Sequence, residues 1–122
     1  MQFSEDQNSG KYFINSYHPG EIKINQTVYS HSIILTAESL SEWPPQTIDQ
    51  LNSQDFVIVA KQRPEVVLLG TGKKQYFPKA AILAPLIEQN IGFEIMDTAA
   101  ACRTYNALMA EGRRVVAALI IE

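Results

Sequence analysis

The first part of the chain alternates apolar and polar residues with the period of two that is typical of half-buried β-strands. Residues 11–17 (KYFINSY) are rich in β-favouring side chains and are followed by the turn sequence His18-Pro19-Gly20. Residues 21–25 (EIKIN) alternate strictly, and residues 27–36 (TVYSHSIILT) begin in alternation and end fully apolar. The pattern predicts a β-meander of three strands that forms one layer over the core.

A connection with a short helix follows in residues 39–54 (SLSEWPPQTIDQLNSQ). Thr47 is a suitable N-cap for this helix, and Asp49 lies in its first turn, where the helix dipole favours an acidic side chain. Trp43 precedes two prolines, so it cannot lie within a regular helix or a central strand. A large aromatic beside rigid prolines more often packs at the edge of the core than binds a ligand, and we expect that role for Trp43.

The hydrophobic pattern changes at Phe56. Residues 56–60 (FVIVA) and 66–70 (VVLLG) are continuous apolar runs, without alternation. Such runs are typical of strands that are covered on both faces, so the sequence predicts two buried strands here.

A helix is predicted over residues 78–90, with Pro78 near its first turn and Asn90 at its C-terminal end. Pro85 lies inside this segment. Because proline lacks an amide hydrogen and clashes with the preceding turn, we expect it to kink or split the helix.

The last third predicts a strand, a helix and a second strand. Residues 93–96 (FEIM) read as a short buried strand, and Asp97-Thr98 supplies an N-cap for a helix over residues 99–111 that ends at Gly112. Residues 113–121 (RRVVAALII) predict another buried strand.

Residues 66–121 therefore have the order strand, helix, strand, helix, strand, which is most simply built with parallel strands and right-handed crossovers. The sequence predicts an α/β fold: a single three-layer domain over residues 1–122, with a βαβαβ core in a mostly parallel sheet and an N-terminal β-meander layer. In this layout the chain leaves the strands after Leu69 and Met96 at a common edge of the sheet.

Length and charge exclude some classes of protein. The chain has 122 residues, 46% of them apolar, and a net charge of −3, so it lacks the basic footprint of a nucleic-acid-binding protein. Its start resembles neither a secretory signal nor a transit peptide, and the apolar run at residues 115–121 is too short to cross a bilayer. We therefore expect a cytoplasmic protein without membrane insertion. The single cysteine excludes an internal disulfide.

The glycine pair in Gly70-Thr71-Gly72 does not complete a known phosphate-binding motif. A Walker loop requires glycine at position 67 and a hydroxyl side chain at position 74, where the chain has valine and lysine. The dinucleotide fingerprint requires glycine at position 75, where the chain has glutamine. The pair is therefore interpreted first as a tight turn after a buried strand.

A small-ligand pocket is the alternative interpretation, because ligands of parallel α/β sheets bind beyond the carboxyl ends of the strands. Gly70, Thr71, Gly72, Asp97 and Thr98 lie at two such ends, and a helix N-terminus there offers free N–H groups to an anion. Lys73 and Lys74 add positive charge, whereas Asp97 would repel an anion.

Cys102, Arg103 and Asn106 lie on the same predicted helix as Thr98 and extend this candidate site. A cysteine one turn from a helix N-terminus can have a lowered pKa, but a lone cysteine among alanines is more often a small core residue. With one cysteine and two histidines, and no nucleotide motif, we expect no metal and no cofactor. No catalytic residues are assigned.

Arg113 and Arg114 open the last predicted strand. In one interpretation, these arginines form surface ion pairs with Asp97, Glu94 or Glu111. In the other, they form a patch that contacts a protein or binds an anion.

Several segments resemble a family of uncharacterised domains that includes mitochondrial complex I assembly factor 3 and small stand-alone bacterial proteins. They are LLGTG (residues 68–72), Phe77-Pro78, residues 92–120 (GFEIMDTAAACRTYNALMAEGRRVVAALI) and Trp43-Pro44. The resemblance covers nearly the whole chain and implies a three-layer α/β domain with an extra β element. It implies no catalytic residues, and it implies protein partners, with NADH dehydrogenase subunits as the candidates.

Two hypotheses follow, and a third, nucleic-acid binding, is disfavoured by the acidic balance because it requires a basic stripe of Lys73, Lys74, Arg113 and Arg114. The first is a non-enzymatic interaction or assembly protein. The second is a binder or enzyme for a small anion or nucleotide-like ligand at the loops 70–72 and 97–98, assisted by Cys102, Arg103 and Asn106.

Overall fold

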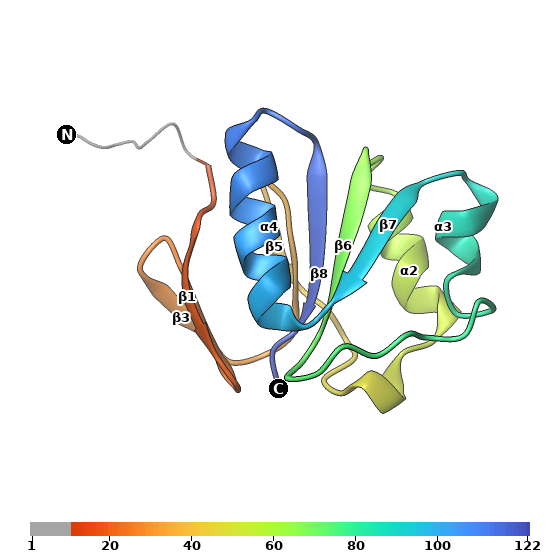
Figure 1. The fold of residues 1–122 in the computed structure, drawn as a ribbon, viewed down its shortest axis with the longest axis horizontal. Helices are drawn as coiled ribbons and strands as arrows, with labels where there is room; N and C mark the ends of the chain where they lie inside the picture. Colours follow the sequence, from red (N-terminus) through yellow and green to blue (C-terminus); the bar gives the residue numbers. More distant parts are fainter. Residues whose placement is uncertain (1–10) are drawn as a thin grey trace.

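The computed structural model describes residues 11–122, which form two β-sheets with helices packed against the larger one (Figure 1). Residues 1–10, whose composition argued against a targeting sequence, lie outside the described residues. The elements are β1 (Ile14–His18), β2 (Glu21–Ile24), β3 (Thr27–Tyr29), β4 (Ile33–Leu35), β5 (Leu40–Glu42), the 3-10 helix η1 (Ile48–Gln50), α2 (Ser53–Ala60), β6 (Val66–Thr71), α3 (Ala84–Glu88), β7 (Gly92–Met96), α4 (Thr98–Ala110) and β8 (Val115–Ile120).

The larger sheet has the strand order β5-β4-β8-β6-β7. Strand β6 pairs in parallel with both β7 and β8, which confirms the predicted parallel βαβαβ core. The hairpin β4–β5 extends this core through antiparallel pairing of β4 with β8, so the whole sheet is mixed. The smaller sheet is the predicted antiparallel meander, with the order β1-β2-β3.

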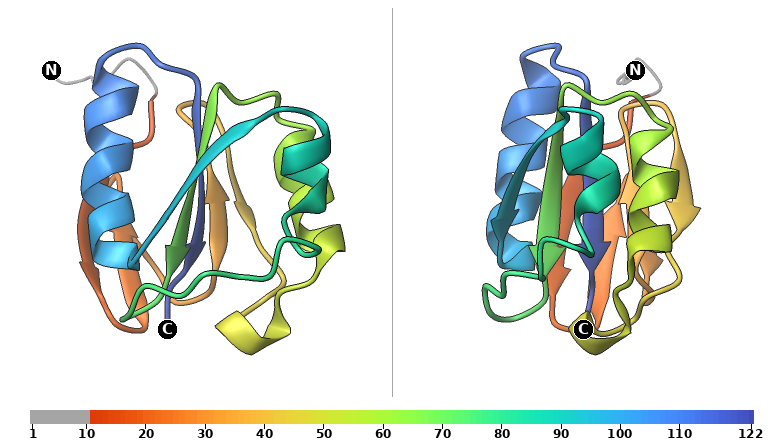
Figure 2. Two further views of the ribbon diagram at one scale, coloured as in Figure 1. Left: turned by 45° about the vertical axis from the view of Figure 1, so that its right-hand side comes forward. Right: turned by 90° about the vertical axis from the view of Figure 1, so that its right-hand side faces the viewer.

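The central strands are covered on both faces, as their continuous apolar sequence predicts. Val66 and Leu68 of β6 pack in the core with α4 and the meander, whereas Val67 and Leu69 pack in the core with α2 and α3. Figure 2 shows α4 and α2 on opposite sides of the sheet. The structure therefore has an α4-plus-meander side, a central sheet and an α2–α3 side.

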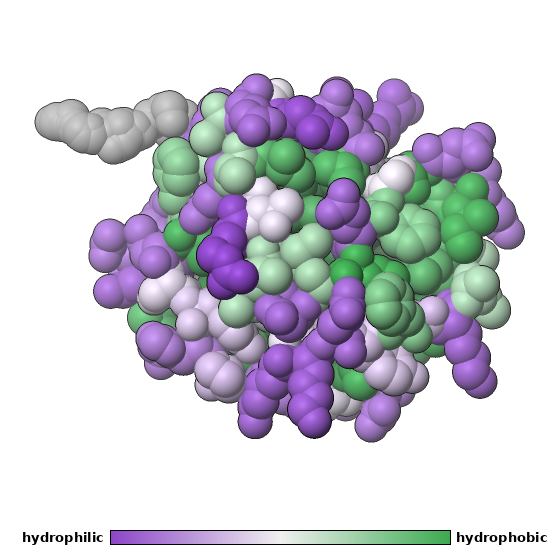
Figure 3. All heavy atoms as spheres, in the orientation of Figure 1, coloured by the Kyte–Doolittle hydropathy of each residue, from purple (hydrophilic) through white to green (hydrophobic). Residues whose placement is uncertain are grey.

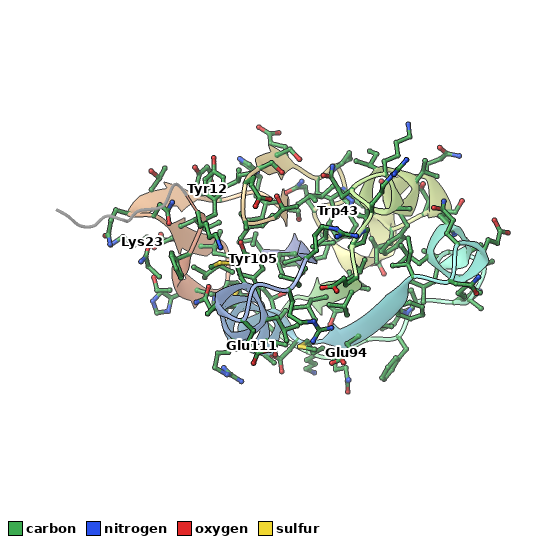
Figure 4. All side chains as sticks on the ribbon, turned by 90° about the horizontal axis from the view of Figure 1, so that it is seen from above. Tyr12, Lys23, Trp43, Glu94, Tyr105 and Glu111 are labelled. Carbon is green, nitrogen blue, oxygen red and sulfur yellow. The ribbon has the colours of Figure 1, made fainter. Side chains whose placement is uncertain are left out.

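Trp43 fills the core on the α2 side, as expected. It is fully buried, its ring meets Phe56 edge to face at 5.6 Å between centroids, and its Nε1 donates to the carbonyl of Asp55 at 3.1 Å. Tyr105 is equally buried on the α4 side, where its hydroxyl donates to the carbonyl of Tyr12 at 2.9 Å. Figure 4 shows these two aromatic side chains on different sides of the sheet.

The strand predicted over residues 56–60 is wrong, because this segment belongs to helix α2. Asn52 caps the helix: its side chain accepts from Gln54 N at 2.9 Å, and the Asp55 carboxylate accepts from Asn52 N at 2.9 Å. This capping box starts a helix directly before the apolar run. Phe56 is buried and Ile58 is 42% exposed. Residues 56–60 therefore pack one side of a helix against the sheet and leave the other side in solvent.

The helix predicted after Thr47 also changes. Thr47 precedes only the short η1 and makes no side-chain capping bond, and Asn52 is the residue that caps a full helix.

The segment of residues 27–36 contains two strands that belong to different sheets, β3 in the meander and β4 in the larger sheet. One continuous strand was therefore the wrong prediction for this segment. The chain leaves the meander after Tyr29, and Ile33 begins a new pairing with Leu119 of β8.

The helix predicted over residues 78–90 shrinks to α3, and Pro85 occupies its first turn instead of kinking its middle. Proline is favoured there because its missing N–H has no intrahelical partner to lose. Strand β7 is also less buried than predicted, because it is the edge strand of the sheet and Gly92 and Glu94 are exposed.

Within residues 11–122, each helix is too short or too polar to traverse a bilayer.

Candidate functional site

The two loops singled out in the sequence meet in the structure. Gly70 lies opposite Met96 of β7 on one side and opposite Leu119 of β8 on the other. The carboxyl ends of the three parallel strands therefore lie at one edge of the sheet, at the end of the molecule where the chain terminates in Figure 1.

Thr98 ties these strand ends together. Its buried Oγ1 accepts a hydrogen bond from Gly72 N at 2.8 Å and donates one to the carbonyl of Ile120 at 2.7 Å. Its backbone N–H donates to the carbonyl of Gly72 at 2.9 Å. We call Gly70, Gly72 and Thr98 the strand-end clasp.

The two glycines of the clasp have different roles: Gly70 allows Thr98 to approach the backbone closely, and Gly72 allows the chain to turn. A Cβ on Gly70 would lie 2.9 Å from Thr98 Oγ1, closer than real Cβ contacts are, and at a tight 3.1 Å from Thr98 Cα. Gly72 has a φ of +94°, a backbone conformation that L-residues rarely adopt. The turn interpretation thus has a direct structural basis.

The N-terminus of α4 is occupied by groups of the chain itself. Asp97 is its N-cap: Asp97 Oδ1 accepts from Ala100 N at 2.8 Å, and the Asp97 carbonyl accepts from Ala101 N at 3.0 Å. Since the amides of Gly72, Thr98 and Ala100 are already paired, an anion at this position would have to displace internal hydrogen bonds.

A hollow lies beside the clasp. It has a volume of about 370 Å³, and we call it the strand-end hollow. The Thr71 hydroxyl shapes its wall, because it lies within hydrogen-bonding distance of the carbonyls of Lys74 and Met96 and accepts from Tyr76 N at 3.2 Å. The hollow is lined by Ile48, Thr71, Gly72, Lys73, Lys74, Gln75, Tyr76, Ile120 and Glu122.

Cys102, Arg103 and Asn106 do not line this hollow. They face β1 across a separate hollow of about 210 Å³, which Ala99 and residues 14–17 also line. The Asn106 side chain accepts from Ile14 N at 3.0 Å and donates to the carbonyl of Ile14 at 2.8 Å, so it pairs with β1 as a neighbouring strand would. The predicted ligand residues are therefore divided between two places.

Cys102 is 5% exposed, and burial raises the pKa of its thiol to about 12. The thiolate is the nucleophilic form, and a pKa this high keeps the thiol protonated near neutral pH. The structure thus places Cys102 as a core residue.

Arg113 and Arg114 lie at the opposite, amino end of the parallel strands. Arg113 Nε lies 3.6 Å from Glu65 Oε1, and Arg114 N donates to the same oxygen at 2.8 Å. The backbone N–H of Arg114 and the charge of Arg113 lower the pKa of Glu65. The partner of Arg113 is therefore Glu65, and none of the three acids expected from the sequence.

These two arginines line a hollow of about 360 Å³ with Lys11, Glu38 and Glu65. We call Lys11, Arg113 and Arg114 the amino-end cations. Lys11 and Glu65 could not be placed here from the sequence, because they lie far along the chain from the arginines.

The residues of the structure from 11 to 122 contain no group of three His, Cys, Asp or Glu side chains that could hold a metal ion.

Comparisons with known proteins identify relatives over nearly the whole length of the chain. A protein of Francisella tularensis called "13 kDa major membrane protein" is 28% identical over 98% of this chain and 99% of its own. The rat "NADH dehydrogenase [ubiquinone] 1 alpha subcomplex assembly factor 3" is 31% identical over 88% of this chain. The match spans 60% of the length of that assembly factor.

A solved structure has the same fold. The crystal structure of a protein from Bordetella parapertussis is 39% identical, with a TM-score of 0.87 over 93% of this chain and 98% of that one. Residues 14–120, from the first residue of β1 to the last of β8, match a family model described as "Protein of unknown function (DUF498/DUF598)". The chain belongs to the DUF498/DUF598 family, to which its sequence segments and its two-sheet α/β fold both point.

Proposed function

We propose that this protein is a non-enzymatic protein-interaction domain that assists the assembly of NADH dehydrogenase. The observation that carries the proposal is the 31% identity to the rat assembly factor over 88% of this chain. The proposal takes the partners to be NADH dehydrogenase subunits and the location to be cytoplasmic.

The geometry of the predicted site supports an interaction role over a catalytic one. The amides and hydroxyl of the strand-end clasp bind one another, and the thiol of Cys102 is buried and protonated. Catalysis requires groups that are free to contact a substrate, whereas the clasp groups have internal partners and the thiol is buried.

The amino-end cations are the surface that we assign to a partner. Arg113 is 45% exposed, and its contact with Glu65 is long, at 3.6 Å. An exposed pair of this kind contributes little to folding and can be replaced by a contact with an acidic partner. We expect such a partner to place carboxylates against Lys11 and Arg113.

Affinity purification from native cells tests the proposal. The tag belongs at the N-terminus, because the backbone of Ile121 accepts from Gly20 N and the backbone of Glu122 accepts from the Tyr17 hydroxyl. We expect NADH dehydrogenase subunits to be enriched, and we expect Arg113→Glu with Arg114→Glu to remove them.

Lys23→Glu with Lys61→Glu makes the same change of charge elsewhere and serves as the control. Recovery of no NADH dehydrogenase subunit above the level from untagged cells would contradict the proposal. If both double variants recovered equal amounts of NADH dehydrogenase subunits, Arg113 and Arg114 would not belong to the contact surface.

A small-anion ligand is the second candidate, favoured by Lys73 and Lys74 on the wall of the strand-end hollow. Because the clasp is internally bonded, the ligand would lie beside Gly72 and not in the turn itself. Nucleotides, acyl phosphates and organic anions at 100 times their Kd would stabilise the protein by about 2.7 kcal/mol. Thermal unfolding should then show a rise in Tm that Lys73→Gln with Lys74→Gln removes, and no rise with any of these anions would leave the candidate unsupported.

A further inference from the structure

The segment that follows the clasp has a charge unlike that of the rest of the chain. Residues 72–87 contain three lysines and no acidic residue, whereas the whole chain has a net charge of −3. The three lysines surround two adjacent aromatics, Tyr76 and Phe77. We call Lys73, Lys74, Tyr76, Phe77 and Lys79 the basic aromatic loop.

The aromatic side chains of this loop are directed to solvent. Tyr76 is 51% exposed and Phe77 is 65% exposed, which makes Phe77 the most exposed large apolar side chain within residues 11–122. Ile87 of α3, at the end of the same acid-free segment, is 46% exposed. Apolar side chains that are exposed singly need no explanation, but a cluster in one segment indicates a binding surface.

The loop is held in place at its base, so its exposure is a property of the fold. Gln75 Nε2 donates to the carbonyl of Ile95 on edge strand β7 at 2.9 Å, and Tyr76 N donates to Thr71 Oγ1 at 3.2 Å. Pro78 is buried directly after Phe77. Figure 2 shows the segment between β6 and α3 crossing the molecule below β7, and Figure 3 shows apolar residues gathered over the β7 and α3 region.

The three lysines are exposed, and none forms an ion pair with a side chain of residues 11–122. Two acidic side chains lie nearby: Glu122 lines the strand-end hollow with Lys73 and Lys74, and Glu94 is exposed on β7. The loop itself presents only positive charge, and the next acid along the chain is Glu88.

We propose that the basic aromatic loop binds the surface of an anionic lipid bilayer. The rings of Tyr76 and Phe77 would lie at the level of the headgroups, where amphipathic aromatics are stable, and the lysines would contact anionic lipids. A lipid surface needs no complementary groove, and exposed lysines lie on both sides of the aromatic pair along the chain. The contact is peripheral and independent of the proposed assembly function.

Flotation with lipid vesicles tests the proposal on the full chain. We expect the protein to float with vesicles of phosphatidylglycerol and phosphatidylcholine and to remain unbound with phosphatidylcholine alone. High salt should release it, because salt screens exposed charges. The partition coefficient should fall about fivefold for each lysine removed in Lys73→Gln and Lys74→Gln, and Phe77→Ser should lower it further.

Ile58→Ser with Lys61→Gln is the matched control. It removes one exposed apolar side chain and one exposed lysine from α2 and the turn after it, and the partition coefficient should not change. A loss of binding as large in this control as in the loop variants would overturn the assignment of the surface.

A fluorescent reporter separates lipid contact from unfolding. Trp43 is the only tryptophan and is fully buried, so its fluorescence should not respond to lipid. Phe77→Trp adds a second, exposed tryptophan whose fluorescence reports on the loop. Its emission should shift to shorter wavelength with anionic vesicles and stay unchanged with glycerol phosphate, the soluble headgroup analogue. An equal shift with glycerol phosphate would indicate a free-anion site and overturn the proposal.

Absence of flotation at low salt would also overturn it. So would a result in which Phe77→Ser abolishes recovery of a protein partner in lipid-free extract while vesicle binding stays unchanged, because the loop would then be a protein-docking site.

Discussion

The basic aromatic loop directly follows Gly72 of the strand-end clasp in the sequence, yet the two regions differ in burial and in hydrogen bonding. Thr98 is fully buried and its hydroxyl bonds to two backbone groups from different segments. Phe77 is 65% exposed, and the lysines around it form no ion pairs among the described residues. Beyond the carboxyl ends of the strands, where ligands of α/β proteins often bind, the groups of the clasp are paired with one another, whereas exposed side chains begin at Lys73.

Gly70→Ala should have the largest effect on stability. The added Cβ would lie 2.9 Å from Thr98 Oγ1 and 2.9 Å from Leu119 Cδ2, so these side chains and the packing around them must shift. We expect the free energy of unfolding to fall by about 3 kcal/mol, as for an overpacked core. Urea denaturation measures it.

Gly92→Ala is the control, because a Cβ there would meet only the carbonyl of Glu65 at 3.7 Å, an ordinary contact. Equal losses for both variants would show that Gly70 is not held by close packing.

Thr98→Val should lower the free energy of unfolding by about 2 kcal/mol, because it leaves the buried N–H of Gly72 and carbonyl of Ile120 without their partner. Thr98→Ser keeps the hydroxyl and should lose less than half of that. Amide hydrogen exchange should accelerate at Gly72 in the valine variant only. Unchanged exchange there would contradict the clasp.

Alkaline pH should weaken the fold through Cys102. Its pKa rises from 9.0 to about 12 in the folded protein, because burial disfavours the thiolate. Between these values the unfolded chain loses the proton and the folded chain keeps it. Stability therefore falls as pH rises through this window, by at most about 1.4 kcal/mol per pH unit.

Cys102→Ala should make the free energy of unfolding fall less steeply as pH rises. Chemical denaturation at a series of pH values measures this. Burial also raises the pKa of Tyr105, which acts with the same sign at higher pH. A wild-type curve that is no steeper than that of Cys102→Ala would contradict the assignment.

Phe77→Ser should have the smallest effect on stability, within about 0.5 kcal/mol, because the ring is largely in water already. Thermal unfolding checks this. If Phe77→Ser lowered the free energy of unfolding as much as Thr98→Val, the loop would contribute to the stability of the fold. The loop and the clasp would then not differ in this respect.

The elements read best from the sequence were those with local signals that agree with one another. Helix α4 has its predicted N-cap at Asp97 and its predicted end at Gly112, where φ is +81°. Strands β6 and β8 are covered on both faces, as their apolar runs predict. Parallel pairing and the meeting of the loops after β6 and β7 followed from the order of these elements.

The elements read worst were short apolar segments whose period does not distinguish a helix from a strand. Residues 56–60 form part of α2, and the deciding signal was the capping pair Asn52 and Asp55 just before them. Strand β7 has an apolar sequence but lies at an edge, and a position within a sheet cannot be read from five residues.

The candidate site was predictable in its location and not in its chemistry. The sequence placed Gly72 and Thr98 near each other. It could not show that these two residues, 26 positions apart, hydrogen-bond to each other and so leave these groups without a free partner for a ligand. It also grouped Cys102 and Asn106 with Thr98 on one predicted helix, whereas in the structure the Asn106 side chain pairs with the backbone of Ile14 in β1.

By itself, the sequence determined the α/β class, the helix and strands of the C-terminal half and the edge at which their ends meet, because periodicity, caps and element order are local properties. Only the tertiary structure decided that the clasp is closed, that β4 and β5 extend the sheet and that Phe77 stays in water. These outcomes depend on which distant groups compete for the same hydrogen bonds and the same apolar surface, and that competition is settled when the chain packs.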